Sequence, residues 1–167
     1  MNYWHTFAEL MRTPFLHVAL VWGIVPLYFG LLLNELTSDK ANFRTALQTG
    51  FSFLWAGAQW LWPYFKLRGP NEPELELNAM LPVNLLVTFS VIALGFLALF
   101  SGVRKKFPNH LRFIGHTRFA NYFMITIFPI QAHYLAWTWE RFIAIILFAV
   151  PIWLLLHFGL MPIRNRQ

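Results

Sequence analysis

The chain contains no cysteine, and this absence removes several kinds of chemistry at once. Disulfide bonds, thiolate nucleophiles and zinc or iron–sulfur sites with cysteine ligands are all excluded. Charge is scarce as well, because only 12% of the 167 residues are Asp, Glu, Lys or Arg. An average soluble domain carries about 25% charged residues. The composition therefore points away from a soluble domain.

The sequence also lacks the short motifs that identify common enzymes. It has no His-Glu-x-x-His, no Gly-x-Ser-x-Gly, no Walker loop and no glycine-rich dinucleotide turn. Acidic residues are absent from the apolar segments, except for Glu35 at a boundary. Ion pumps and cation-coupled transporters normally need a buried carboxylate, so this scarcity weakens both classes. We expect a protein that is not an enzyme.

What the chain has in abundance is apolar side chains, which make up 57% of its residues and gather in five stretches. Each stretch is close in length to the ~20 residues that a helix needs to cross a bilayer core about 30 Å thick. The stretches are too long and continuous for the strands of a membrane barrel. We therefore predict an all-α polytopic integral membrane protein, a compact bundle of five transmembrane helices. The predicted spans are residues 14–34, 46–65, 78–100, 119–137 and 142–161.

The parts of the chain outside the single transmembrane domain, residues 14–162, are short. In residues 1–13, Trp4, Phe7 and Met11 recur at helical spacing, which predicts a short amphipathic helix lying on the membrane surface. A frayed tail is the alternative for this segment. Residues 163–167 form a basic cytoplasmic tail. The first apolar stretch is not followed by a small-residue cleavage site, so we interpret it as a permanent span rather than a signal peptide.

The basic residues predict the orientation of the five spans. An odd number of crossings places the two termini on opposite sides of the membrane. Of the 13 Lys and Arg residues, nine fall on the side of the C-terminus and four on the side of the N-terminus. The positive-inside rule makes the first side cytoplasmic, so the N-terminus is expected outside. Aromatic residues typical of an interfacial belt map near the outer boundary: Tyr3, Trp4, Trp60, Trp62, Tyr64, Tyr134, Trp137 and Trp139.

The most basic stretch lies in the inner loop, residues 103–118. The net charge of +6 could suggest nucleic acid, but the basic residues flank apolar segments instead of forming a stripe on a soluble fold. Contact with anionic lipid headgroups is therefore the expected role of this loop. A bacterial cytoplasmic membrane is the default assignment, and no nucleic-acid partner is expected. The predicted headgroup contacts are Arg104, Lys105, Lys106, Arg112 and Arg118.

Polar residues inside the spans usually face protein or a water-filled cavity, because lipid offers them no hydrogen bonds. Helical spacing places them on a few common faces. We interpret these faces as sites of hydrogen bonding between helices. The alternative is a polar track for a substrate or for protons. The residues concerned are Gln48, Ser52 and Gln59 in the second span, Asn84 in the third, and Tyr122 and Thr126 in the fourth.

Two histidines, His17 and His133, fall at similar depth in the outer third of the predicted membrane. A pair of imidazoles could hold a haem b or relay protons. Two histidines without a carboxylate make a poor zinc site, so no metal site is expected. The plainer interpretation treats both as interfacial histidines at the ends of their spans.

Minimal mass outside the membrane, small-residue faces and many exposed aromatic residues favour an accessory or structural subunit. Such a subunit would pack against a partner membrane protein or a second copy of the chain within the lipid bilayer. The alternatives are a membrane-embedded redox-cofactor subunit, binding haem b or a quinone, and a small transporter or lipid-handling protein. No cofactor is our first expectation.

Overall fold

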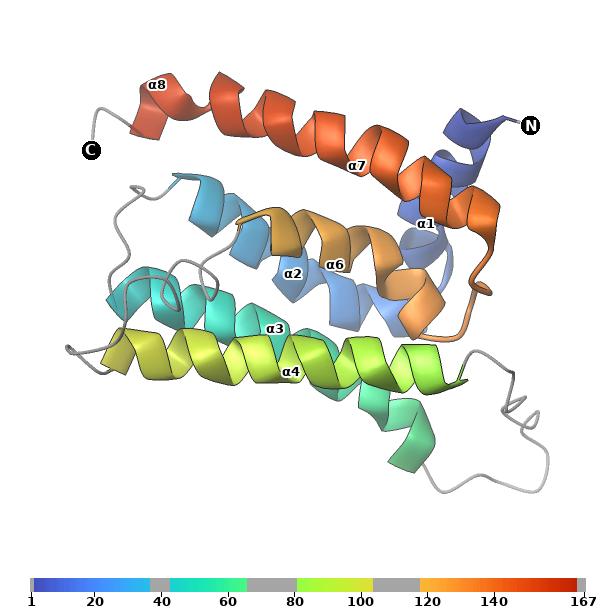
Figure 1. Ribbon diagram of the computed structural model, residues 1–167, viewed down its shortest axis with the longest axis horizontal. Helices are drawn as coiled ribbons and strands as arrows, with labels where there is room; N and C mark the ends of the chain where they lie inside the picture. Colours follow the sequence, from blue (N-terminus) through green and yellow to red (C-terminus); the bar gives the residue numbers. More distant parts are fainter. Residues whose placement is uncertain (1, 37–42, 66–80, 104–117, 165–167) are drawn as a thin grey trace.

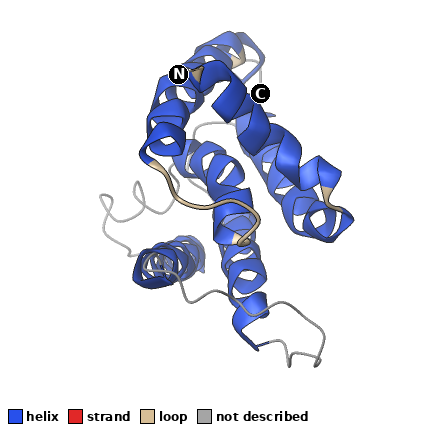
Figure 2. Cartoon of the chain, turned by 90° about the vertical axis from the view of Figure 1, so that its right-hand side faces the viewer, coloured by secondary structure: helices blue, strands red, loops and turns tan. Residues whose placement is uncertain are grey.

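The computed structural model describes residues 2–36, 43–65, 81–103 and 118–164, and all regular structure in these ranges is helical (Figures 1 and 2). This confirms the all-α prediction. The helices are α1 (Tyr3–Leu16), α2 (Val18–Leu36), α3 (Phe43–Phe65), α4 (Leu81–Val103), α6 (Arg118–Gln131), α7 (Trp139–Gly159) and the short α8 (Met161–Arg164).

Among the described helices, α4 and α7 are long and apolar enough to cross a membrane. The pair α1 and α2 would add a third span if this bent pair is counted as one. Length and composition are thus compatible with an integral membrane protein, and they identify two or three candidate spans rather than five. Helix α6 has 14 residues, or about 21 Å of helix, which is shorter than a bilayer core of about 30 Å.

The helix bounds differ most from the predicted spans at two places. Helix α1 continues through Pro14 to Leu16, and the axis then turns by 108° at His17, so that α2 begins at Val18. Helix α6 ends at Gln131, six residues before the predicted end of the fourth span. Elsewhere the ends of α3, α4 and α7 lie within three residues of the prediction.

Five of the helices run back and forth along one axis. In Figure 1, α2, α4 and α7 run toward one end of the bundle, while α3 and α6 run toward the other. Helices α3 and α4 form one layer, α2 and α6 the next, and α7 lies on the opposite side. Consecutive helices among these five are therefore antiparallel.

Glycines bring α3 and α4 into close contact. An added Cβ at Gly57 would lie 2.3 Å from Ile92 Cγ1, and one at Gly50 would lie 2.5 Å from Leu99 Cγ. Small residues at such crossings let two backbones approach closely, which is a main source of helix association in membranes. The face of α4 that the structure buries consists of Asn84, Thr88, Val91, Gly95, Ala98 and Ser101.

Helix α6 is the centre of the bundle, because α1, α2, α3 and α7 all pack against it. Every residue from 124 to 131 is buried. A helix surrounded by protein does not have to match the thickness of a lipid bilayer. The polar side chains of Asn121, Thr126 and Gln131 are accordingly buried inside the protein.

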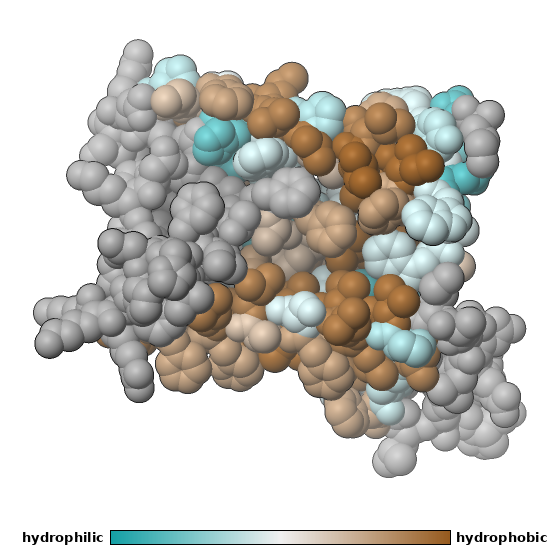
Figure 3. All heavy atoms as spheres, viewed as in Figure 1, coloured by the Kyte–Doolittle hydropathy of each residue, from teal (hydrophilic) through white to brown (hydrophobic). Residues whose placement is uncertain are grey.

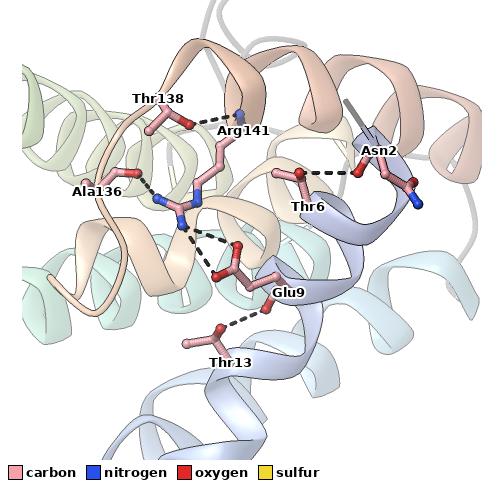
Figure 4. Close-up of polar contacts among 7 residues, drawn as sticks. All are labelled: Asn2, Thr6, Glu9, Thr13, Ala136, Thr138 and Arg141. Atoms are coloured by element: carbon pink, nitrogen blue, oxygen red, sulfur yellow. Dashed lines mark hydrogen bonds and ion pairs between the residues drawn. The ribbon is translucent and has the colours of Figure 1, made fainter.

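Helix α1 folds back onto α7. Phe7 and Leu10 are buried there, and the ring of Phe7 packs against Phe148 at a centroid distance of 5.2 Å. Arg141 links the two helices at the start of α7 (Figure 4). Its guanidinium lies 3.3 Å from the Glu9 carboxylate and donates a 2.7 Å hydrogen bond to the carbonyl of Ala136. Because the Glu9 side chain is 41% exposed, the ion pair itself contributes little to stability.

The outer surface of the bundle is largely apolar. Figure 3 shows apolar side chains over α4 and α7 on the face in view. A soluble monomer rarely exposes a continuous apolar patch larger than a few hundred Å². Such a surface is suited to lipid or to another membrane protein. The most exposed large side chains include Trp22, Phe65, Leu86, Trp139 and Leu155.

Candidate functional site

One group of polar side chains gathers where α6 ends, at the end of the bundle that holds the connection to α7. We call this group the end cluster. Its members come from α3, from α4 and from residues 131–137, so that it joins three parts of the chain. They are Tyr64, Asn84, Thr88, Gln131, His133 and Trp137.

Two hydrogen bonds hold the end cluster together. The indole N–H of Trp137 donates to Asn84 Oδ1 at 2.7 Å. The hydroxyl of Thr88 donates to Gln131 Oε1 at 3.2 Å. Asn84 and Thr88 lie one helical turn apart on the buried face of α4, so both bonds tie this helix to the residues that follow α6. These contacts fix the position of the connection between α6 and α7.

Some buried polar atoms near the end cluster have no hydrogen-bond partner within the protein. These atoms are Gln131 Nε2, His133 Nε2 and, on the neighbouring turn of α3, Trp60 Nε1. Gln131 and Trp60 are almost completely buried. Two of the atoms carry hydrogen in every protonation state, so this region can supply hydrogen bonds to an acceptor such as a water or a ligand oxygen.

The backbone at His133 explains why α6 ends where it does. The N–H of His133 donates to the carbonyl of Ile130 at 3.0 Å, and the N–H of Tyr134 donates to the carbonyl of Pro129 at 3.0 Å. This pair of bonds is the Schellman motif, with His133 at the position that usually holds glycine. His133 accordingly has a positive φ of 63°. Its side chain lies beyond the helix and does not continue the face of Tyr122 and Thr126.

Replacement of His133 tests this local conformation. A left-handed residue other than glycine costs about 1–2 kcal/mol, so His133→Gly should preserve the turn and offset part of the loss of the ring contact with Tyr64. His133→Ala should lose that contact without relieving the strain. We expect His133→Ala to be the less stable variant by about 1 kcal/mol in a denaturation series in detergent. Equal stability of the two variants would contradict the assigned role of the backbone.

The two histidines proposed for a cofactor contact different tyrosines. The His133 ring lies edge-on to Tyr64 at a centroid distance of 5.2 Å. The His17 ring, in the bend between α1 and α2, lies 4.6 Å from Tyr134. His17 is exposed, whereas His133 is partly buried. Each imidazole thus has its own aromatic neighbour, and this arrangement adds no support for haem b at this pair.

The polar face predicted for α3 packs against α2. Ser52 packs directly against Gly30, where an added Cβ would clash with the Ser52 side chain. Trp55 donates a 3.1 Å hydrogen bond to the carbonyl of Gly23. Gln59 lies near the same glycine. The Trp55 bond joins the two helices, whereas the Ser52 hydroxyl donates to the carbonyl of Gln48 in its own helix at 3.0 Å. Gln48 differs from the others, because its Oε1 has no hydrogen-bond partner within the protein.

At the other end of α6, Tyr122 lies beside Glu35 of α2. Both side chains are buried, with exposures of 6% and 2%. The sequence places Glu35 only at a boundary, and its burial depends on the packing of α2 against α6. Thr126, one turn further along α6, donates to the carbonyl of Phe123 at 2.8 Å. A buried carboxyl group is a functional candidate that helical spacing alone does not identify.

The predicted headgroup contacts Arg104, Lys105, Lys106 and Arg112 lie outside the described residues, as does the side chain of Arg118. Among the residues that the structure describes, no group of three or more His, Asp or Glu is placed to hold a metal ion. Comparison of the chain with family models, curated proteins and solved structures found no match. The functional argument therefore depends on the geometry of this chain alone.

Proposed function

We propose that the chain is a small integral membrane protein that acts as an accessory subunit and packs against a partner membrane protein. The observation that carries the proposal is a groove between α2 and α3, with a volume of about 320 Å³. Its walls are apolar except for Gln48 and Ser52. The lining residues are Val25, Pro26, Phe29, Gly30, Leu33, Gln48, Phe51 and Ser52.

The chemistry of the groove favours a protein helix as its occupant. Gln48 Oε1 is a buried acceptor without a partner in this chain, whereas Ser52 already donates to the carbonyl of Gln48 at 3.0 Å. A lipid tail has no donor to offer to this oxygen. Once the Gln48 amide turns toward the groove, a transmembrane helix that carries Ser, Thr or Asn can donate to it, and such bonds are typical of helix contacts in membranes. The exposed rings of Phe29 and Phe51 would flank that helix.

Five membrane crossings are part of the same proposal. The alternating directions of α2, α3, α4, α6 and α7 support it, and the excess of basic residues supports a cytoplasmic C-terminus. In this arrangement α6 crosses inside a shell of other helices. The bacterial cytoplasmic membrane remains the proposed location.

Photocrosslinking from the groove tests the accessory role. A benzophenone amino acid in place of Phe51 should form a crosslink to a distinct membrane protein in native membranes. The same amino acid in place of Leu155, on the exposed face of α7, should crosslink mainly to lipid. A product with twice the mass of the chain would indicate a second copy and would contradict the accessory role. So would a monomer that purifies in mild detergent without any crosslinked protein.

Substitution of Gln48 provides the matching energetic test. Gln48→Leu should lower the yield of co-purified partner by about 3- to 15-fold, since hydrogen bonds between membrane helices contribute about 0.6–1.7 kcal/mol. Ser90→Leu, on the exposed face of α4, is the control and should leave the yield unchanged. An equal yield from the two variants would remove Gln48 from the proposed contact.

A further inference from the structure

A second cavity lies on the opposite face of α2 from the groove, where α1, α2, α6 and α7 meet. Its volume is about 180 Å³. Tyr28 and Leu31 line it from α2. They follow the groove residues Pro26 and Phe29 by two positions each, which is about half a helical turn, so they lie on the opposite face of α2. A ligand in this cavity would thus be independent of a partner in the groove.

The walls of this cavity are almost entirely apolar. Phe7 and Met11 come from α1, Ile125 from α6, and Ala149 and Ile152 from α7. The hydroxyl of Thr126, which also lines the cavity, is already donated to a backbone carbonyl. An apolar cavity of about 150 Å³ in a protein core stays dry and binds benzene or xenon. The walls here therefore select an apolar occupant over water.

The shape of the cavity is suited to a chain. Its lining on α7 extends from Ala149 to Leu156, which is about 10 Å along the helix. Ile152 lies between these two residues, and it lines the cavity while being 38% exposed on the outer surface. The cavity thus reaches the membrane-facing side of the bundle at Ile152. An aliphatic chain can enter there from the surrounding lipid.

The ring of Tyr122 completes the wall of the cavity on α6. Its hydroxyl is buried and lies beside the carboxyl group of Glu35, so it does not face the cavity. The lining therefore offers only apolar contacts, which suit a methylene chain and not a polar headgroup.

We propose that the cavity between α1, α2, α6 and α7 binds the end of an aliphatic chain of a membrane lipid, whose headgroup stays outside the bundle. The chain enters beside Ile152 and lies along α7 toward Leu156. Bound there, it fills the space between α7 and the central helix α6. The site is distinct from the partner groove, so that lipid binding and partner binding can fail separately.

A photoreactive fatty acid tests the site directly. The purified full-length protein is placed in vesicles of phosphatidylethanolamine and phosphatidylglycerol that contain a diazirine-labelled fatty acid. Labelling should occur on the peptides that contain Met11 and Leu156, at the cavity walls. Ala149→Leu fills the cavity and should reduce this labelling, whereas Ala93→Leu, on the exposed face of α4, should not.

Two further variants keep the test decisive if Ala149→Leu fails to fold. Ile152→Trp closes the exposed opening without changing the core and should also reduce labelling at Met11. Leu156→Trp narrows the other end of the cavity along α7 and should likewise reduce labelling at Met11. Unchanged labelling at Met11 in Ile152→Trp, or labelling confined to the exposed faces of α4 and α7, would overturn the proposal.

Discussion

Gly57→Ala is expected to destabilise the bundle by about 1–3 kcal/mol, the usual result of overpacking a close contact. The new Cβ would lie 2.3 Å from Ile92 Cγ1 and 3.0 Å from its Cδ1. Ile92 is β-branched and lies within α4, so its χ1 has one strongly preferred rotamer and cannot simply turn away. Relief therefore requires α3 and α4 to move apart, and chemical denaturation in detergent should reveal the loss.

Gly159→Ala is the matched control for this experiment. A Cβ at Gly159 meets no atom within 4 Å. Alanine is favoured over glycine in a helix by about 0.8–1 kcal/mol, so this variant should be unchanged or slightly more stable. Equal destabilisation of the two variants would show that the contact between α3 and α4 does not decide the result.

Asn84→Leu is expected to produce the second large effect. The substitution leaves the partly buried indole N–H of Trp137 without its acceptor, and the loss of such a hydrogen bond costs about 0.5–1.5 kcal/mol. Trp137→Phe removes the donor instead and leaves the amide of Asn84. In a double-mutant cycle the two substitutions should show a coupling of about 0.6–1.7 kcal/mol, the range for hydrogen bonds between membrane helices.

The exposed serine on the same helix is the control for Asn84. Ser90 lies on the outer surface, and its hydroxyl donates a hydrogen bond to the carbonyl of Leu86 within α4. Ser90→Ala should change stability by no more than about 0.5 kcal/mol. Additive effects of the Asn84 and Trp137 substitutions would contradict the assigned role of their hydrogen bond in holding the connection between α6 and α7.

Much of the helical architecture could be predicted from the sequence, because the apolar stretches and the short polar gaps mark where helices begin and end. The fourth span was the main exception. Its apolar residues continue to Trp137, yet the chain leaves the helix after Gln131 through a turn with His133 in the left-handed region. Glycine is the usual signal of such a turn, and histidine at this position conceals it.

Helical spacing also predicted inward faces for α3 and α4, and Ser52 and Asn84 from those faces are buried in the structure. It could not predict the partners. The contacts of Thr88 with Gln131 and of Tyr122 with Glu35 join residues far apart in the chain. These pairs depend on how the helices are arranged around α6, which no periodicity in a single helix determines.

The proposed five crossings arranged around α6 are the central claim of this account, and the absence of cysteine makes them directly measurable. Single cysteines can replace exposed residues at the two ends of the bundle: Phe65 and Trp139 at one end, Phe43, Val103 and Met161 at the other.

A membrane-impermeant thiol reagent applied to intact cells should label Phe65→Cys and Trp139→Cys. The cysteines at the other end should react only after the membrane is permeabilised. If α6 entered and left on the same side, Val103→Cys and Trp139→Cys would react alike, and Met161→Cys would behave in the opposite way. That result would contradict the five-crossing arrangement.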